Sequence, residues 1–160
     1  MTRRACLLSL AASPACLLAG TSTLIPLGEQ AFHQMVARHR GKVLLVDFWA
    51  TWCGGCREEM PKLVTLYSSE RKNDFSFVTI SCDEPEQAAA AISFLEKQSA
   101  PAPYYLKSAK NDDQFISAID PKWSGALPAL FLFDRTGQKV NSFIGETDIQ
   151  QLKVSIDKLL

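Results

Sequence analysis

The chain has 160 residues, of which 47% are hydrophobic and 21% charged, an ordinary composition for one globular domain. Lysine and arginine together number 17, as do aspartate and glutamate, so the formal net charge is zero. Because the sequence has no basic run and no basic excess, it gives no reason to expect a nucleic-acid partner.

The first part of the chain differs in composition from the rest. Two arginines precede residues 5–19, which carry no charged side chain. A basic start followed by a short apolar stretch is typical of a secretory signal, whereas a membrane-spanning helix needs about 20 apolar residues. We therefore expect residues 1–22 to be a signal peptide or N-terminal anchor, and residues 23–160 to form the folded domain. A buried N-terminal helix and a lipid anchor at Cys16 are the alternatives.

The folded part opens with a helix–strand–helix pattern. After a short connector at 24–28, apolar residues at helical spacing predict a helix over 29–39. The strand expected over 42–49 contains an apolar run that does not alternate with polar residues, which is typical of a parallel strand buried on both faces. The following segment, from Cys53 to about Asn73, has a helical apolar face, and Pro61 should kink that helix.

The second part is expected to hold a strand, a helix with Asp83 at its N-cap, and a further short strand and helix. A hairpin follows, with Gly137 at a turn position of positive φ, and then a closing helix. In order, these elements fall at residues 75–81, 83–100, 104–106, 112–119, 129–134, 140–144 and 149–159. The order predicts an α/β domain with one mixed sheet, made from a parallel βαβ unit and a later hairpin–helix unit, covered by helices on both faces.

Two cysteines lie where the strand at 42–49 passes into the following helix. Cys53 at the first turn of that helix meets unpaired backbone N–H groups and the positive end of the helix dipole, which favour the reactive thiolate. Cys56 lies one turn further on, close enough to form a disulfide. We expect a reversible redox pair, with Cys53 as the exposed nucleophile and Cys56 as the buried resolving thiol.

The alternative for such a pair is half of a zinc site. A structural zinc ion needs four ligands, and the other candidates are Cys82, His33 and His39. The two histidines are six residues apart on one predicted helix, so they face different ways. We therefore expect no metal, and we interpret Cys82 as a small structural hydrophobe.

Two carboxyl groups are candidates for proton transfer. Asp47 lies within the predicted buried strand, where desolvation should raise its pKa, and such an acid beside a buried thiol can act as its general base. The alternative is that Asp47 ends the strand and reaches solvent. Glu59 lies one turn beyond Cys56; from spacing alone, a position lining the thiols and an ordinary solvated position are equal alternatives. Trp52 and Trp123 are expected either in the core or in a substrate groove.

These residues together resemble the thioredoxin superfamily, and within it the TlpA/ResA-like periplasmic thiol–disulfide oxidoreductases. The resemblance covers residues 24–160. It rests on Val-Asp-Phe-Trp-Ala-Thr-Trp-Cys-Gly-Gly-Cys-Arg-Glu-Glu-Met-Pro, which ends at Pro61, and on Gly-Ala-Leu-Pro-Ala-Leu-Phe-Leu-Phe-Asp, which ends at Asp134. It implies a thioredoxin fold with a TlpA-like βα insertion between its halves and an extra N-terminal helix.

The resemblance also implies roles for individual residues. Pro128 matches the cis-proline beside the dithiol, and with Trp52 and Leu127 it is expected to bind substrate. Glu59 matches the acid near the thiols in TlpA-like proteins, and Asp47 matches the buried acid of thioredoxin, where many TlpA-like chains have asparagine. Gly-Gly between the cysteines departs from the family, which commonly has proline in the second position.

The implied function is that of an exported, monomeric thiol–disulfide oxidoreductase that needs no cofactor. It would reduce protein disulfides in the periplasm, draw electrons from a membrane thiol donor and serve, for example, cytochrome c maturation. A peroxiredoxin-like thiol peroxidase is one alternative, although Cys53 has an immediate partner thiol. A Sco-like copper-binding assembly protein is another, although no histidine follows His39. A structural domain with an idle dithiol is the third.

Overall fold

The computed structural model describes residues 22–70 and 74–160. The expected leader at 1–22, with Cys16, therefore lies outside the described residues except for its last position. The strands are β1 (Leu24–Leu27), β2 (Val43–Trp49), β3 (Phe75–Ser81), β4 (Tyr104–Lys107), β5 (Ala129–Phe133) and β6 (Lys139–Ile144). The helices are α1 (Glu29–Arg38), α2 (Gly54–Ser69), α3 (Ala88–Lys97), α4 (Asp112–Ile119) and α5 (Ile149–Asp157), and a 3₁₀ turn at Pro85–Gln87 precedes α3.

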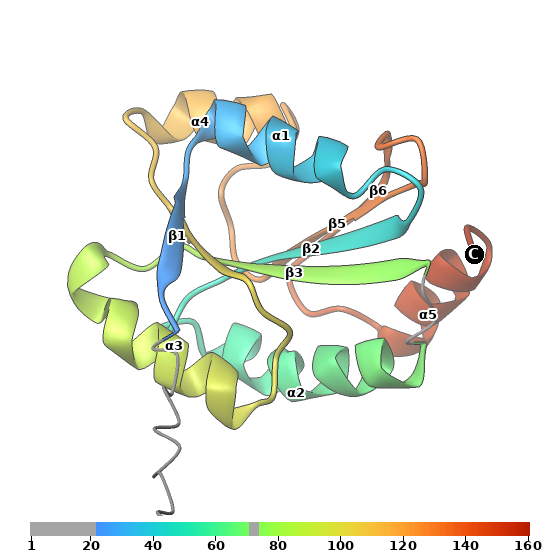
Figure 1. Cartoon of the computed structure of the whole chain (residues 1–160), viewed down its shortest axis with the longest axis horizontal. Helices are drawn as coiled ribbons and strands as arrows, with labels where there is room; N and C mark the ends of the chain where they lie inside the picture. The colour runs from blue at the N-terminus through green and yellow to red at the C-terminus, as the bar shows by residue number, and fades with distance from the viewer. Residues whose placement is uncertain (1–21, 71–73) are drawn as a thin grey trace, which may run out of the picture.

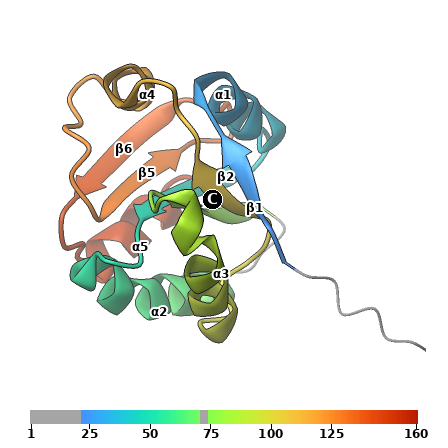
Figure 2. The same ribbon diagram turned by 90° about the vertical axis from the view of Figure 1, so that its left-hand side faces the viewer.

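A mixed sheet lies between two layers of helices. It has six strands in the order β1-β4-β3-β2-β5-β6. The first four are parallel in that order, whereas β5 is antiparallel to both of its neighbours. Helices α1 and α4 cover one face, and α2, α3 and α5 cover the other (Figures 1 and 2). The predicted mixed sheet and the thioredoxin fold are thus confirmed.

Strand β2 is the centre of the core, and all seven of its residues are buried. It is hydrogen-bonded to β3 on one side and β5 on the other. Val43, Leu45 and Trp49 pack beneath α2, whereas the apolar residues between them pack towards α1 and α4. Since both faces are covered, the apolar run in this strand does not alternate.

Two expectations about element boundaries were wrong. The connector expected at 24–28 contains strand β1, which pairs in parallel with β4 at the edge of the sheet, where Pro26 is tolerated. Helix α2 ends at Ser69 rather than near Asn73, with Glu70 as its C-cap, and Pro61 lies inside its assigned span.

The turn before α3 also differs from the expectation. Asp83 is not the N-cap; Glu84 is, and its N–H donates to the side-chain oxygen of Gln87 at 3.2 Å. The Asp83 carboxylate instead accepts hydrogen bonds from Thr51 and Ser81. The hairpin turn is as predicted, because Gly137 has a φ of 84°.

Candidate active site

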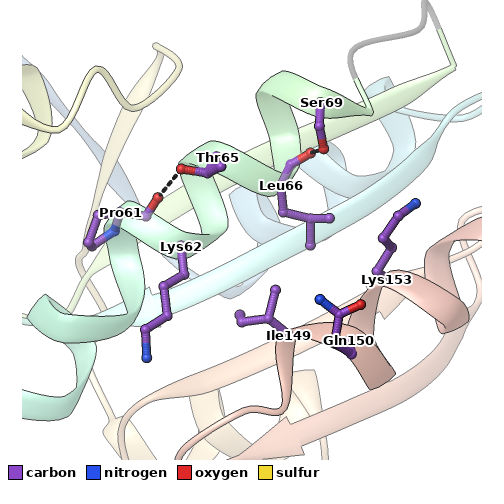
Figure 3. Close-up of a pocket in the computed structure, with 8 residues that line it drawn as sticks. All are labelled: Pro61, Lys62, Thr65, Leu66, Ser69, Ile149, Gln150 and Lys153. Atoms are coloured by element: carbon purple, nitrogen blue, oxygen red, sulfur yellow. Dashed lines mark hydrogen bonds between the residues drawn. The ribbon is translucent and has the colours of Figure 1, made fainter.

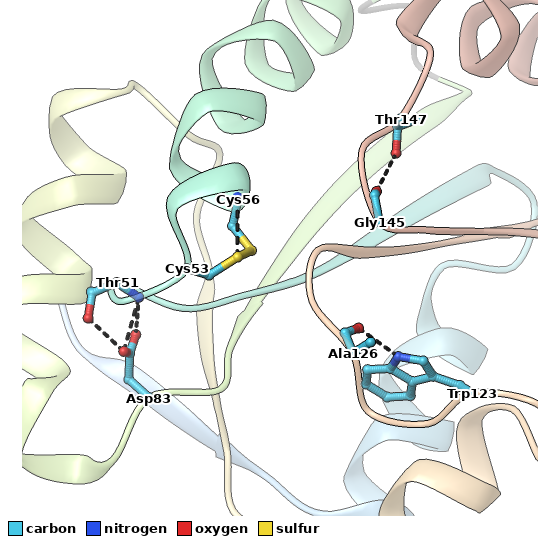
Figure 4. Close-up of a disulfide and its surroundings, with 8 residues drawn as sticks. All are labelled: Thr51, Cys53, Cys56, Asp83, Trp123, Ala126, Gly145 and Thr147. Carbon is cyan, nitrogen blue, oxygen red and sulfur yellow. Dashed lines mark hydrogen bonds between the residues drawn. A yellow bond between two sulfur atoms is a disulfide. The ribbon is translucent and has the colours of Figure 1, made fainter.

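Cys53 and Cys56 form a disulfide at the start of α2 (Figure 4). Cys53 is the N-cap residue, and its sulfur accepts a hydrogen bond from the backbone N–H of Cys56 at 3.2 Å. No acidic side chain lies in the first turn of α2. The sulfur of Cys53 therefore lies where the unpaired N–H groups and the positive end of the helix dipole are directed, which favours its thiolate after reduction.

Both sulfurs belong to the core beneath α2. Cys53 is 9% exposed and Cys56 is 2% exposed. Cys53 is the more accessible of the two, in the predicted order, but the expectation that it is exposed is wrong for the disulfide form. The exposed side chain is that of its neighbour Trp52, which is 64% exposed.

Asp47 lies beneath the disulfide-bearing helix and does not reach solvent. It is 2% exposed and pairs in register with Thr79 on β3 and Leu130 on β5. Burial raises the pKa of its carboxyl group well above the 3.8 that is usual for aspartate, and the nearby Glu59 carboxylate raises it further. A protonated acid in this position can exchange a proton with a buried thiol.

Glu59 is also buried, at 5% exposure. One of its oxygens accepts the backbone N–H of Thr147 at 3.1 Å, from the segment before α5. Burial raises the pKa of Glu59, and the hydrogen bonds from Thr147 and the charge of Lys62 oppose this rise. Of the two alternatives left open by the spacing, the solvated position is therefore excluded.

A cavity of about 80 Å³ lies beside Glu59. Gly55 and Pro128 line its side towards the dithiol, and Lys62 and Glu146 are among its other lining residues. A polar space of this size can hold water molecules. The cavity thus extends from the buried Glu59 carboxyl group towards charged side chains.

Pro128 packs against the turn between the two cysteines. The Leu127–Pro128 peptide bond is cis, and a Cβ atom placed on Gly55 would be 3.7 Å from the Cδ atom of Pro128. The carbonyl oxygen of Pro128 accepts the N–H of Gly145 at 2.9 Å. Leu127 is partly buried and contacts the core on both sides of the sheet.

Trp123 supports this loop from the opposite side of the sheet. It is buried and packs on Phe48 and Phe131, with ring centroids 4.9 and 5.2 Å away. Its indole N–H donates to the carbonyl oxygen of Ala126 at 2.9 Å (Figure 4). Trp123 is therefore a packing residue, whereas Trp52 is exposed beside the dithiol.

Asp83 belongs to the site, although the sequence pattern predicted only a helix N-cap at this position. Its carboxylate, 3% exposed, accepts the backbone N–H of Thr51 at 3.0 Å and the Thr51 hydroxyl at 2.7 Å (Figure 4). The Ser81 hydroxyl donates to it at 2.7 Å. These bonds tie the segment before Cys53 to the end of β3. The signal was available, because the carboxyl ends of adjacent parallel strands meet at one edge of a sheet.

The third cysteine within residues 22–70 and 74–160 is not part of the disulfide. Cys82 is partly buried after β3 and contacts the core on both sides of the sheet. Burial raises the pKa of its thiol to about 12. Burial therefore favours the protonated thiol over the reactive thiolate, in agreement with the structural interpretation.

The histidines lie on the other face of the sheet from the dithiol. His33 is in α1 and His39 is its C-cap, whereas the cysteines lie at α2 (Figure 1). Across residues 22–70 and 74–160, no three His, Cys, Asp or Glu side chains are grouped as metal ligands would be. None of the helices within these ranges is both long and apolar enough to span a membrane.

A larger groove of about 500 Å³ runs between α2 and α5 (Figure 3). Leu66 and Ile149 contribute apolar side chains, and Lys62 and Lys153 contribute charged ones. Neither cysteine lines it. The features that lie beside the dithiol are therefore the smaller cavity, Pro128 and the exposed Trp52, and not this groove.

Comparison with known proteins agrees with this geometry. The family model described as Redoxin matches residues 23–157. The chain belongs to the redoxin family. The thiol–disulfide oxidoreductase ResA of a Bacillus cereus strain is 32% identical over 120 residues, which is 75% of this chain and 65% of that protein. ResA of Geobacillus kaustophilus is 30% identical over 62% of this chain and 53% of that protein.

The chain thus spans about two thirds or less of the length of these curated relatives. A thioredoxin family thiol:disulfide interchange protein from Chlorobium tepidum has a similar structure, with a TM-score of 0.63 and 23% identity over 77% of this chain and 83% of that one. The structure of a DsbF homologue from Corynebacterium diphtheriae matches with a TM-score of 0.64. It is 18% identical in sequence, over 78% of this chain and 76% of that one. The resemblance to the thioredoxin superfamily and its ResA-like members is confirmed.

Proposed function

We propose that the chain is a thiol–disulfide oxidoreductase that exchanges its Cys53–Cys56 pair with protein disulfides. The observation that carries the proposal is the position of the pair. Cys53 caps α2, Cys56 lies in the core, and two buried carboxyl groups, Asp47 and Glu59, lie on the same side of the sheet. This arrangement supplies a stabilised thiolate, a second thiol and proton acceptors, without a cofactor.

The first step is attack by the reduced enzyme. The Cys53 thiolate attacks one sulfur of a substrate disulfide, a new sulfur–sulfur bond forms, and the second substrate sulfur leaves as a thiolate that takes a proton. Trp52, Leu127 and Pro128 surround the approach to Cys53 and bind the substrate chain. An extended segment beside the Pro128 loop would be held by strand-like backbone hydrogen bonds.

The second step releases the substrate. Cys56 gives its proton to Asp47 or Glu59, and its thiolate attacks Cys53. The Cys53–Cys56 bond forms while the bond to the substrate breaks, and the substrate leaves as a thiolate that takes up the proton. Two electrons have passed from the enzyme to the substrate, so a dithiol donor must reduce the enzyme again.

The remaining assignments are supported by the resemblance to TlpA/ResA-like proteins and by the N-terminal composition. Residues 1–22 act as an export signal or anchor, and residues 23–160 act as a monomeric domain in the periplasm. The enzyme works as a reductant fed by a membrane thiol donor, with cytochrome c maturation as one use. Its reduction potential tests the direction: about −270 mV, as in thioredoxin, supports a reductant, and about −120 mV, as in DsbA, contradicts it.

The activity is tested by reduction of insulin disulfides with dithiothreitol as the electron source. We expect Cys53→Ser to abolish catalysis, because it removes the attacking sulfur, and Cys56→Ser to trap a mixed disulfide. Cys82→Ser is the matched control and should retain activity. Undiminished catalysis by Cys53→Ser would contradict the proposal. Rapid peroxide consumption with a thiol donor, in the absence of disulfide reduction, would favour a thiol peroxidase instead.

A further inference from the structure

Three side-chain nitrogen or oxygen atoms that are themselves inaccessible to solvent lack a protein hydrogen-bond partner within the described part of the chain, and they share one side of the sheet. They are the indole nitrogen of Trp49, one carboxylate oxygen of Glu59 and the hydroxyl oxygen of Thr79. Trp49 and the α2 residues beside Glu59 belong to the core that contains the disulfide. Buried polar groups without a protein partner commonly bind internal water.

Thr79 lies directly beside Asp47. The two residues are register partners on the adjacent parallel strands β3 and β2. They share the side of the sheet that faces α2, because Phe77 and Trp49, each two positions away along its strand, pack in that core. Thr79 is 0% exposed and Asp47 is 2% exposed. A hydroxyl donor and a carboxyl acceptor are thus buried side by side.

The Asp47 carboxyl group has no direct hydrogen bond to any of the described residues, and its titratable neighbours are acids. Glu59 approaches from α2, together with the two cysteines, and the Cys82 thiol interacts with Asp47 from the end of β3. On the other side, β5 presents the apolar Leu130. Lys62 and Glu146 act on Glu59 at the cavity. The Thr79 hydroxyl, on the register partner of Asp47, is therefore an adjacent donor that can stabilise ionised Asp47.

We propose that Thr79 is a positioning residue whose hydroxyl, through one buried water molecule, donates a hydrogen bond to Asp47 and holds its carboxyl group beneath the Cys53–Cys56 pair. A water molecule suits two polar groups that are adjacent but not in direct hydrogen-bond contact. The inference rests on the proposed function, in which Asp47 accepts the Cys56 proton. Its chemical effect is to favour the ionised, proton-accepting form of Asp47.

The test compares Thr79→Val, which keeps the shape and removes the hydroxyl, with Thr79→Ser, which retains it. Ser76→Ala, on the same strand but the opposite face, is the matched control. We expect Thr79→Val to move both the acidic limb of the insulin-reduction profile and the carboxyl titration of Asp47 to higher pH. The titration is followed by ¹³C NMR in the oxidised protein, and the expected shift is about one pH unit. Thr79→Ser and Ser76→Ala should match the parent.

A merely structural hydroxyl gives a different result. Thr79→Val would then unfold at a higher temperature, because an unpaired buried polar group is lost, with the Asp47 titration unchanged. That outcome overturns the inference. If Thr79→Val does not fold, a high-resolution crystal structure of the parent decides, because a water within hydrogen-bond distance of both Thr79 and Asp47 is required. The NMR titration needs no activity, so failure of the proposed function is recognised separately by absent insulin reduction.

Discussion

At the scale of single residues, the burial of Asp47 affects both its protonation and the stability of the fold. Its burial beneath α2 raises the pKa of the carboxyl group, which favours its protonated form over a wider pH range than is usual for aspartate. The same burial makes its ionised form unfavourable in the folded chain. An ionisable acid at the centre of a fully buried strand should therefore lower the stability of the fold.

The unfavourable ionised form gives a prediction for Asp47→Asn. Between the ordinary pKa of 3.8 and the raised folded value, the folded parent binds a proton more tightly than the unfolded parent. Its free energy of unfolding should fall as pH rises through this window, by up to about 1.4 kcal/mol per pH unit. Asp47→Asn lacks this loss, so its advantage should be small at low pH and grow towards neutral pH in urea unfolding. The exposed Asp113→Asn should show no such trend; an equal advantage at every pH would contradict the prediction.

At the scale of elements, the first turn of α2 has room for side chains at both of its glycines. A Cβ atom on Gly55 would make an ordinary contact with Pro128, and Gly54 has open space around it. Neither glycine has a positive φ. The backbone at this turn therefore does not require glycine, and either residue between the cysteines can be changed to alanine without a clash.

We expect Gly55→Ala to raise the free energy of unfolding of the oxidised protein by about 0.4–1 kcal/mol, because alanine restricts the unfolded chain. Denaturant unfolding measures this effect. Gly41→Ala is the contrasting control: its surroundings are also open, but its φ is 90°, so it should destabilise the protein. A loss of stability in Gly55→Ala would show that the turn needs glycine for another reason.

The carboxylate of Asp83 joins two elements at the same edge of the sheet. Asp83→Asn replaces one acceptor oxygen by a donor that faces the N–H and hydroxyl groups of Thr51 or the hydroxyl of Ser81. We expect a loss of about 1–3 kcal/mol in stability and faster hydrogen exchange of the Thr51 amide. Asp134→Asn, in the distant hairpin turn, should leave that amide unaffected. An unchanged Thr51 amide in Asp83→Asn would rule out the tether.

At the scale of the whole molecule, the sequence predicted what depends on local pattern. The unbroken apolar run of β2 marked the central strand, and the cysteine spacing at its end marked the redox pair. Strand β1 escaped prediction because its partner β4 lies far along the chain and only tertiary pairing makes 24–27 a strand. The role of Asp83 escaped for a different reason. The predicted βαβ unit already brings the ends of β2 and β3 to one edge of the sheet, but a helix cap and a link to Thr51 require the same residue type, and only the side-chain contacts distinguish them.

The burial of both sulfurs in the core joins two properties that are usually measured separately. Oxidised and reduced folded chains, and oxidised and reduced unfolded chains, form a closed thermodynamic cycle. The difference in unfolding free energy between the two redox forms must equal the free energy by which folding changes the dithiol–disulfide equilibrium. A difference of about 1.4 kcal/mol corresponds to about 30 mV. A substituted side chain that packs against Cys56 better in one redox form than in the other therefore changes the reduction potential of the protein, although both cysteines are retained.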